Sequence, residues 1–420
     1  MFAVKGPVLI LGRARSGEAV CELLKFVYPD LEVYFYDDVP AKSDFKNQSE
    51  VLNRKWAHAI LSPVFPQTPF IDQLVAQGVY LAQEMDVAAA FLTDEKVYVI
   101  TGSVGKSTCA WVAYQALASL HKKVFIGGNF GVPFAQYVLN LKKYNREKAE
   151  YLIIEMSSYQ TERMAFMIDR ALILNLYPNH LDRYKDLDAY YLAKLRLLNF
   201  SREGVWGINP GGDLYDFAKL SGVDHKIRWI ELSRGTNLFK HSQLLGEHNR
   251  ANLAALLEFV ASADLDESQV VDGLNLAEAL PHRVELFTHK NSFFVNDSKA
   301  TTVESVLSAY SALRERFPDR PLIWLLGGRD KKLPWVKLKR FWSDRSLELI
   351  FFGEAGSLIK EQTGLQGEVE RSLKDALQAI QKRFQENALL VLSPGGTSLD
   401  EFKSFEDRGD FFKSFIQQNF

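Results

Sequence analysis

The chain has 420 residues, of which 47% are hydrophobic and 24% charged, and its formal net charge is −2. This is the composition of an ordinary globular protein, and the length predicts two or three domains of about 100–200 residues each. The nearly balanced charge does not favour a nucleic acid or a membrane surface as the main partner.

The two cysteines, Cys21 and Cys109, form no CxxC pair, so we expect neither a disulfide framework nor a cysteine zinc site. The first residues contain a short apolar run that ends in a glycine-containing turn, which is typical of a β-strand rather than a signal peptide. No apolar stretch approaches the roughly 20 residues that span a bilayer. The sequence therefore predicts a cytoplasmic protein, and we expect a monomer.

Apolar strand patterns alternate with helical patterns along the whole chain, which predicts an α/β fold with parallel sheets covered on both faces. Residues 204–230 are harder to interpret, and a small antiparallel portion is expected there. A proline near residue 281 precedes a new series of strands. The expected strands are 8–11, 32–36, 59–61, 97–100, 151–155, 171–176, 292–296, 322–326, 348–352 and 389–392. The expected helices are 18–26, 71–77, 107–120, 187–200, 249–263, 303–316 and 373–384.

The clearest motif is TGSVGKST at residues 101–108, which lies between a predicted strand and a predicted helix. Glycines let backbone N–H groups approach phosphate oxygens, and the amino terminus of the helix adds positive potential. Lys106 would neutralise the β- and γ-phosphates of ATP, and the Ser107 hydroxyl would bind magnesium. The common GxxxxGK[ST] pattern has a glycine where this chain has Ile100. The alternative is a glycine turn before a helix, with an incidental lysine.

A second glycine turn, residues 12–17, follows the first predicted strand. It could cradle a nucleotide diphosphate, with Asp37 or Asp38 near a ribose at the end of the next strand. Ala14 replaces the middle glycine of the dinucleotide-binding pattern. A tight turn that binds no ligand is the alternative interpretation.

Several polar residues follow predicted strands, where open α/β sheets bind their ligands. Glu155 ends one apolar strand, His180 follows the next, and Lys194 lies on the helix after that. Taken alone, each is better explained as a solvated carboxylate, a loop histidine or a surface lysine. Asp297, Lys299 and Thr301 are spaced by two, so they would share one face of an extended segment.

Taken in chain order, these segments resemble those of the Mur ligases, the ATP-dependent amide ligases of peptidoglycan precursor synthesis. The likeness covers nearly the whole chain, and its last four segments favour the member that adds D-glutamate to UDP-N-acetylmuramoyl-L-alanine. The similar segments are TGSVGKST (101–108), EMSSYQ (155–160), NLYPNHLDRY (175–184), AKL (193–195), GEHNRAN (246–252), LPHRVE (280–285), NDSKAT (296–301), LLGGRDK (325–331) and LSPGGTSLDEFKSFEDRG (392–409).

The resemblance implies three consecutive α/β domains. Residues 1–93 would be a Rossmann-like domain for the UDP substrate, 94–282 a P-loop ATPase domain, and 283–420 a Rossmann-like domain for D-glutamate. It also implies a reaction. The substrate carboxylate would attack the γ-phosphate of ATP to form an acyl phosphate, and the amino group of D-glutamate would then displace phosphate.

The resemblance also implies roles for individual residues. Lys106, Glu155, His180 and Lys194 would be catalytic. Ser107 and Glu155 would hold a first magnesium ion, while His180 and a carbamylated Lys194 would hold a second. ATP would contact Gly102, Ser103, Val104, Gly105, Lys106, Ser107, Thr108, Asn129, Asn249, Asn252, Arg283 and Asp297. The UDP substrate would contact Arg15, Ser16, Asp37, Asn129 and His180, and D-glutamate would contact Lys299, Thr301, Lys331, Ser398, Leu399 and Phe405.

The chain departs from the family pattern at Ala14, Val64, Val104 and Asn179, none of which is a catalytic group. Val104 replaces an asparagine of the phosphate loop, and Asn179 replaces the acidic residue before His180. Three other functions remain: a sibling Mur ligase or folylpolyglutamate synthase that uses another amino acid, a regulatory P-loop switch, and a non-catalytic binding module. Lys299, Lys331 and the SLDEFKSFEDRG segment argue against the sibling ligase. Lys194 and the C-terminal lysines argue against the switch. The presence of Lys106, Glu155, His180 and Lys194 argues against the binding module.

Overall fold

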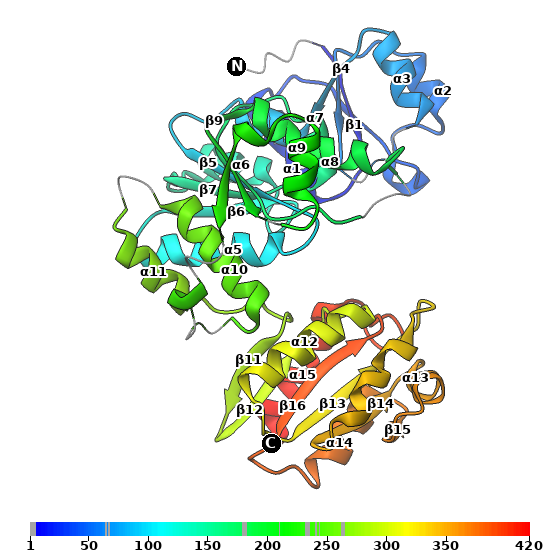
Figure 1. Ribbon diagram of the computed structural model, residues 1–420. Helices are drawn as coiled ribbons and strands as arrows, with labels where there is room; N and C mark the ends of the chain where they lie inside the picture. Colours follow the sequence, from blue (N-terminus) through cyan, green and yellow to red (C-terminus); the bar gives the residue numbers. More distant parts are fainter. Residues whose placement is uncertain are drawn as a thin grey trace. The chain divides into compact units, whose positions relative to one another are not determined.

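The computed structural model describes residues 6–63, 65, 68–178, 183–209, 211–231, 236–239, 242, 244–261 and 265–420, without the side chains of residues 236, 237, 248 and 342. Over these ranges the chain is an α/β structure with three sheets (Figure 1). It divides into two compact units, Met1–Leu238 with Asn252–Leu274, and Phe239–Ala251 with Asn275–Phe420. No helix in the described ranges is long and apolar enough to cross a bilayer.

The first sheet has four parallel strands in the order β2-β1-β3-β4. All four residues of β1 are fully buried, which explains why the sequence there is a continuous apolar run rather than an alternating one. Its strands and helices are β1 (Val8–Leu11), α1 (Arg15–Val27), β2 (Val33–Tyr36), the 3₁₀ helix η1 (Pro40–Lys42), α2 (Gln48–Leu52), β3 (His58–Leu61), α3 (Pro69–Ala76), β4 (Tyr80–Gln83) and α4 (Glu84–Ala89).

The second sheet has six strands, all parallel, in the order β10-β9-β8-β5-β7-β6. Its strands are β5 (Lys96–Thr101), β6 (Val124–Gly128), β7 (Tyr151–Glu155), β8 (Ile168–Ile173), β9 (Ser201–Asn209) and β10 (Ile227–Glu231). The accompanying helices are α5 (Lys106–Ser119), α6 (Phe134–Tyr144), α7 (Ser158–Arg163), α8 (Leu187–Leu195), η2 (Arg196–Asn199), α9 (Leu214–Leu220), η3 (Asp224–Lys226), η5 (Thr236–Phe239), α10 (Glu247–Val260) and α11 (Glu267–Leu276).

The expectation of a small antiparallel portion within residues 204–230 is wrong. β9 and β10 are parallel, and α9 connects them as an ordinary crossover helix. Leu220, the last residue of this short helix, is an exposed leucine, which weakens the helical period of apolar residues in the sequence.

The first two sheets share one apolar core, to which both β1 and β5 contribute. Polar contacts connect the same elements. The Gln83 side chain donates a hydrogen bond to the carbonyl of Gln160 (2.9 Å), and Asp86 accepts one from the amide of Ala165 (2.8 Å). The Glu84 carboxylate accepts the amide of Ala135 at the start of α6. Thus β4 and α4, the last elements of the first sheet's series, are bound directly to α6, α7 and the residues that follow α7.

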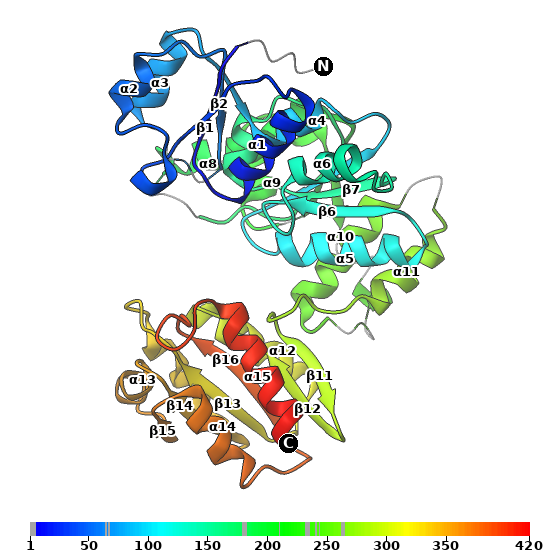
Figure 2. The ribbon, with the colours of Figure 1, turned by 180° about the vertical axis from the view of Figure 1, so that it is seen from behind.

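The third sheet has six strands in the order β11-β12-β16-β13-β14-β15, and within it only the pairing of β11 with β12 is antiparallel. Figure 2 shows α14 and α15 on one face, and Figure 1 shows α12 and α13 on the other. Its elements are β11 (Glu285–His289), β12 (Ser292–Asn296), α12 (Val303–Arg316), β13 (Leu322–Gly327), η6 (Trp335–Ser343), β14 (Leu347–Phe352), α13 (Gly356–Thr363), β15 (Glu368–Glu370), α14 (Leu373–Gln381), β16 (Leu389–Gly395) and α15 (Phe405–Asn419).

Side chains alternate between the two faces of this third sheet, as the pleat of a strand requires. Trp324 and Val391 belong to the core beneath α12 and α13, whereas Leu325 and Leu392 belong to the core beneath α14 and α15. The predicted α/β class with parallel sheets covered on both faces is confirmed. The division into three domains at residues 93 and 282 stays a prediction.

Candidate active site

The TGSVGKST segment connects the carboxyl end of β5 to the start of α5. Gly102 has φ 155° and Gly105 has φ 85°, conformations that L side chains rarely adopt. A Cβ atom on Gly102 would also lie 3.1 Å from the Cβ of Leu174. These glycines therefore let the loop turn sharply into α5, whose first turn carries Lys106, Ser107 and Thr108.

Asn175, which lies beyond the end of β8, holds the tip of this loop. Its Oδ1 atom accepts hydrogen bonds from the amides of Ser103 (3.1 Å) and Val104 (3.0 Å). Its Nδ2 atom donates to the carbonyl of Val104 (3.1 Å). The Ser103 hydroxyl in turn donates to the carbonyl of Tyr177 (3.0 Å). Sequence reasoning placed Asn175 in a motif but gave it no role.

Lys194 lies on α8, buried beside the phosphate loop. Its Nζ atom donates a hydrogen bond to Oγ1 of Thr101 (3.3 Å), and only 1% of its surface is exposed. Burial lowers the pKa of the Lys194 amine well below its usual range, the nearby Lys106 lowers it further, and Glu155 acts in the opposite direction. Lys106 and Glu155, two of the predicted catalytic residues, are thus close enough to Lys194 to act on its charge.

Glu155 ends β7 and is buried with only half of its carboxylate bonded. Asn129 donates a hydrogen bond from Nδ2 to Oε1 (2.8 Å), while Oε2 is buried without a hydrogen-bond partner among the described residues. A buried unpaired carboxylate oxygen is unfavourable unless a cation or a donor satisfies it. A carboxylate oxygen such as Oε2 of Glu155 is a ligand that fits a magnesium ion. Within the described ranges, this site included, no group of three or more His, Cys, Asp or Glu side chains is arranged to hold a metal.

Asn252 lies close to the phosphate loop. A Cβ atom built on Gly105 would lie 3.5 Å from Nδ2 of Asn252. Asn249 belongs to the other compact unit, where its side chain donates to the carbonyl of Leu245 (2.7 Å). His180, together with the departures at Asn179 and Val64, lies outside the described residues.

The glycine turn of the first sheet is held by Asp37. One carboxylate oxygen of Asp37 accepts the amide of Arg13 (2.8 Å), and the other accepts the amide of Val39 (2.9 Å). Arg15 and Ser16 lie in the first turn of α1, which has no side-chain cap. Arg15 donates to the carbonyl of Gly131 (3.0 Å), two residues from Asn129. This turn and the Asn129 loop are therefore neighbours within one compact unit.

In the second unit, the predicted residues gather at the carboxyl ends of three strands. Asp297, Lys299 and Thr301 follow β12, Lys331 follows β13, and Ser398 and Leu399 follow β16. Lys299 places its Nζ atom 3.8 Å from the ring centroid of Phe405, which begins α15. Burial lowers the pKa of Lys299, and the positive charges of Arg283 and Lys331 lower it further, against the opposing charge of Glu406. Three cations thus converge, which suits an anionic ligand.

Asp297 is buried at this edge and is well bonded. Its carboxylate accepts hydrogen bonds from the Ser393 hydroxyl (2.7 Å) and from the amide of Val284 (3.1 Å). Burial raises the pKa of Asp297 to about 7 in spite of these donors and of the nearby Arg283. Arg283 thus lies close to Asp297, whereas the contact of both residues with ATP stays a prediction.

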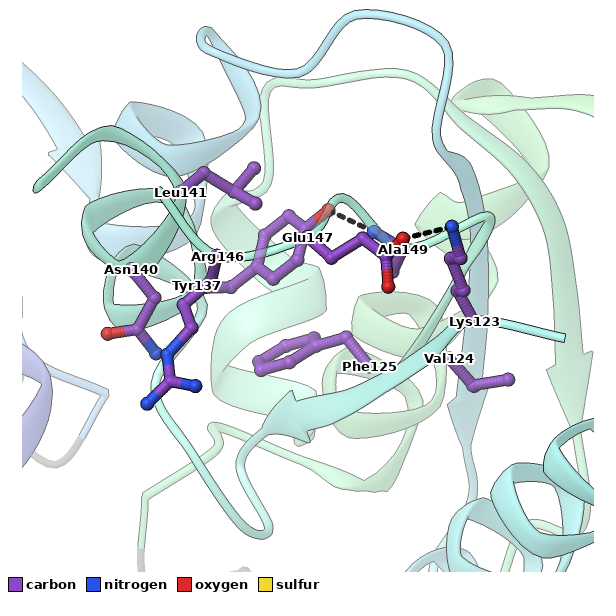
Figure 3. A pocket seen from close by; sticks show the side chains of 9 residues that line it. All are labelled: Lys123, Val124, Phe125, Tyr137, Asn140, Leu141, Arg146, Glu147 and Ala149. Atoms are coloured by element: carbon purple, nitrogen blue, oxygen red, sulfur yellow. Dashed lines mark hydrogen bonds and ion pairs between the residues drawn. The ribbon is translucent and has the colours of Figure 1, made fainter. Parts of the chain in front are cut away.

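A separate cavity of about 330 Å³ lies between β6 and α6 (Figure 3). Phe125 and Tyr137 form its apolar wall, with Lys123 and Arg146 at its sides. Lys123 and Val124 stand at the amino end of β6, whereas the phosphate loop follows the carboxyl end of the parallel strand β5. This cavity is therefore at the opposite edge of the sheet and is separate from the candidate site.

Comparisons with known proteins agree with this geometry. The Mur ligase middle domain matches residues 100–219, and the Mur ligase glutamate ligase domain matches residues 282–396. The UDP-N-acetylmuramoylalanine–D-glutamate ligase of Desulfovibrio desulfuricans is 31% identical over 86% of this chain and 81% of its own length. The enzyme of the same name from Bacteroides thetaiotaomicron is 28% identical over 98% of this chain and 99% of its own.

Solved structures share the fold. The UDP-N-acetylmuramate-alanine ligase of Thermotoga maritima superimposes with a TM-score of 0.59 at 16% identity, covering 98% of this chain and 99% of the other. At this low identity the likeness concerns the fold alone.

Proposed function

Because the chain belongs to the Mur ligase family, we propose that it joins D-glutamate to UDP-N-acetylmuramoyl-L-alanine with cleavage of ATP to ADP and phosphate. It acts in peptidoglycan precursor synthesis. The observation that carries the proposal is the buried Lys194 beside the phosphate loop, which is bonded to Thr101 and lies close to Lys106 and Glu155. A protein that only bound a nucleotide would have no need of the buried Lys194.

Three parts of the chain hold the three substrates. Residues 1–93 bind the UDP substrate with Arg15 and Ser16 at the start of α1, where backbone N–H groups attract phosphate. Residues 94–282 bind ATP on the phosphate loop. Residues 283–420 bind D-glutamate. The contact of Arg15 with Gly131 supports this arrangement, because it sets the UDP region beside the Asn129 loop.

The first chemical step is phosphoryl transfer. A carboxylate oxygen of the substrate's L-alanyl group attacks the γ-phosphorus of ATP, and the bond to the β,γ-bridging oxygen breaks, releasing ADP. Lys106 and the amides of the phosphate loop neutralise charge on the phosphate oxygens. Asn129 orients Glu155 through their hydrogen bond of 2.8 Å.

Magnesium fits the residues present. Ser107 and the unpaired Oε2 atom of Glu155 would hold one ion as oxygen ligands. When bound, magnesium supplies charge neutralisation at the phosphates. His180 and a carbamylated Lys194 would hold a second ion.

The surroundings of Lys194 support the proposal that it is carbamylated. Burial and the charge of Lys106 lower the pKa of this amine, which favours its neutral form, and the nitrogen lone pair of that form can attack CO₂. A nitrogen–carbon bond forms and one proton leaves, which gives an anionic oxygen ligand. This anion would offset the positive charge of Lys106, whereas a lysine ammonium would repel it.

The second step is amide formation. The amino group of D-glutamate attacks the acyl carbon, and the carbon–oxygen bond to phosphate breaks. Lys299, Lys331 and the Ser398 hydroxyl bind the two carboxylates of D-glutamate. The nearness of Arg283 and Lys331 to Lys299, which lies over the ring of Phe405, supports this assignment.

The proposal is tested by phosphate release from ATP and magnesium with UDP-N-acetylmuramoyl-L-alanine, comparing D-glutamate, L-glutamate and other amino acids. Release that requires both substrates and prefers D-glutamate is expected. Preference for another amino acid would indicate a sibling ligase with the same mechanism. Release that is indifferent to both substrates would contradict the ligase function.

A further inference from the structure

Arg408 is a fully buried arginine on α15 that the proposed reaction does not use. Its guanidinium donates from Nε to the Ser298 hydroxyl (3.0 Å). Its Nη2 atom donates to the carbonyls of Ser298 (2.8 Å) and Gly396 (3.1 Å). One side chain therefore bridges the segments that follow β12 and β16.

The segment after β13 lies against the same guanidinium. A Cβ atom on Gly328 would come within 2.8 Å of Nη1 of Arg408, and Gly328 has φ 88°. The next residue, Arg329, exchanges backbone hydrogen bonds with Thr397 (2.8 and 3.0 Å). Glycine at 328 thus allows the third segment to approach both Arg408 and the segment after β16.

These three segments carry the residues assigned to D-glutamate. Lys299 adjoins Ser298, Lys331 is three residues beyond Gly328, and Ser398 is two residues beyond Gly396. Arg408 therefore lies against backbone or hydroxyl groups near each of them.

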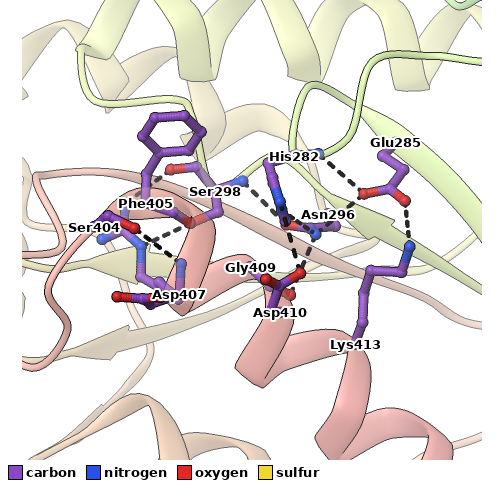
Figure 4. Close-up of polar contacts among 11 residues, drawn as sticks. His282, Glu285, Asn296, Ser298, Ser404, Phe405, Asp407, Gly409, Asp410 and Lys413 are labelled. Atoms are coloured by element: carbon purple, nitrogen blue, oxygen red, sulfur yellow. Dashed lines mark hydrogen bonds and ion pairs between the residues drawn. The ribbon is translucent and has the colours of Figure 1, made fainter. Parts of the chain in front are cut away.

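Ser298 extends the same network to Phe405. The Ser298 hydroxyl donates to the carbonyl of Phe405 (2.8 Å), the residue whose ring lies against Lys299 (Figure 4). Asn296 donates to the carbonyl of Gly409 (3.3 Å), so the first turn of α15 is fixed beside the end of β12. The orientation of the Lys299 amine thus depends on the position of α15.

The surroundings of Arg408 argue against a role in stability alone. Among the described residues, its guanidinium donates to backbone carbonyls and a hydroxyl, and its Nη1 atom is buried without a hydrogen-bond partner. Burial lowers the pKa of Arg408 to about 10, against the opposing charges of Asp400, Glu401 and Asp297. A buried cation is costly, and an apolar side chain of similar volume often gives equal or greater stability.

We propose that Arg408 is a positioning residue for the amino-acid substrate, which holds the segments after β12, β13 and β16 in one geometry so that Lys299, Lys331 and Ser398 meet the same molecule. This inference rests on the proposed function, because it assumes that D-glutamate binds at this edge. It predicts that loss of the bridge weakens use of D-glutamate and leaves acyl-phosphate formation intact.

The test compares Arg408→Lys, Arg408→Met and Ser298→Ala with the wild-type enzyme in two assays. The first is the KM for D-glutamate, ATP and the UDP substrate. The second is acyl-phosphate formation without D-glutamate, trapped by hydroxylamine as the hydroxamate. Arg408→Lys keeps the charge but cannot bridge three acceptors, so its KM for D-glutamate is expected to rise about tenfold or more. The KM for ATP and the yield of hydroxamate are expected to change less than about twofold.

Arg383, which is partly exposed and pairs with Glu348 and Glu368, gives the matched control. Arg383→Met is expected to leave all three KM values unchanged. Thermal unfolding of each variant shows whether it is folded. If Arg408→Met fails to fold, Ser298→Ala tests the proposal in its place. This variant is expected to raise the KM for D-glutamate by a smaller factor and to leave the other two KM values unchanged.

An unchanged KM for D-glutamate in Arg408→Lys and Ser298→Ala, or an equal loss in both assays, would overturn the inference. A wild-type enzyme that forms hydroxamate but does not use D-glutamate would instead contradict the proposed function.

Discussion

The Nζ atom of Lys194 donates a hydrogen bond to Oγ1 of Thr101, the last residue of β5, and so brings a buried lysine to the first residue of the phosphate-loop motif. The same amine lies near a second lysine, Lys106, in a site with one buried carboxylate, Glu155. An ordinary ammonium group is poorly accommodated there. The arrangement is better explained if Lys194 acts in a form that does not carry a positive charge.

Replacement of Lys194 tests this explanation. Both Lys194→Ala and Lys194→Arg should reduce kcat at least about a hundredfold, because neither can form the anionic oxygen ligand. The arginine variant is the control for charge, since it keeps a cation. In the wild-type enzyme, ¹³C-labelled bicarbonate should give a carbamate signal by NMR that both variants lack. Full activity in either variant would exclude the carbamate.

The unpaired oxygen of Glu155 gives a prediction about magnesium. Glu155→Gln can still accept the hydrogen bond from Asn129 through its amide oxygen, but it loses the anionic ligand. The magnesium concentration for half-maximal activity should therefore rise about tenfold or more. Titration of activity with magnesium at saturating ATP measures this change. If the variant's magnesium dependence equals that of the wild type, Glu155 is not a ligand.

Replacement of Asn175 should change the KM for ATP and not the KM for D-glutamate. Asn175→Ala removes the acceptor of two loop amides and the donor to the Val104 carbonyl, each of which contributes about 1 kcal/mol. The KM for ATP should rise about tenfold, with the KM for D-glutamate unchanged. The exposed Asn53, at the end of α2, gives the matched control Asn53→Ala. Equal changes for both substrates would assign Asn175 to general stability.

The raised pKa of Glu84 predicts that the free energy of unfolding depends on pH. Burial raises the pKa of Glu84 to about 7 from an ordinary value of 4.5, and the charge of Asp86 acts in the same direction. Between these values the folded state binds more protons than the unfolded state, so the free energy of unfolding falls as pH rises through this window. By the time the pH exceeds 7, the protein has lost at most about 3 kcal/mol of stability through this group.

Glu84→Gln should remove this loss, because the amide oxygen can still accept the amide of Ala135 without being ionised. Urea unfolding at pH 5 and pH 8 measures the effect. The variant should gain stability over the wild type at pH 8 and little at pH 5. A gain that is the same at both pH values would contradict the assignment.

Strands buried on both faces were predictable from the sequence, since β1, β7 and β13 read as continuous apolar runs. β6 was missed, because it ends in two glycines and most of its residues are only partly buried. The expected antiparallel portion within 204–230 was wrong, since strand direction depends on which elements pair and not on local pattern.

For the site, the phosphate loop was predictable because its glycines and lysine are adjacent in the sequence. Asn175 and Arg408 were not, because their roles lie in contacts with backbone atoms far away in the chain. Asn175 bonds a loop 71 or 72 residues earlier, and Arg408 bonds Ser298 across 110 residues. A backbone acceptor such as the carbonyl of Gly396 cannot be recognised in the sequence, because every residue type carries the same carbonyl group.

The most direct test of the account is the fate of oxygen in the substrate carboxylate. UDP-N-acetylmuramoyl-L-alanine labelled with ¹⁸O in its L-alanyl carboxylate is incubated with ATP, magnesium and D-glutamate, and the released phosphate is analysed by mass spectrometry. Formation of an acyl phosphate followed by amide formation predicts that each released phosphate carries one oxygen from the substrate. Amide product accompanied by unlabelled phosphate would contradict the mechanism proposed for this site.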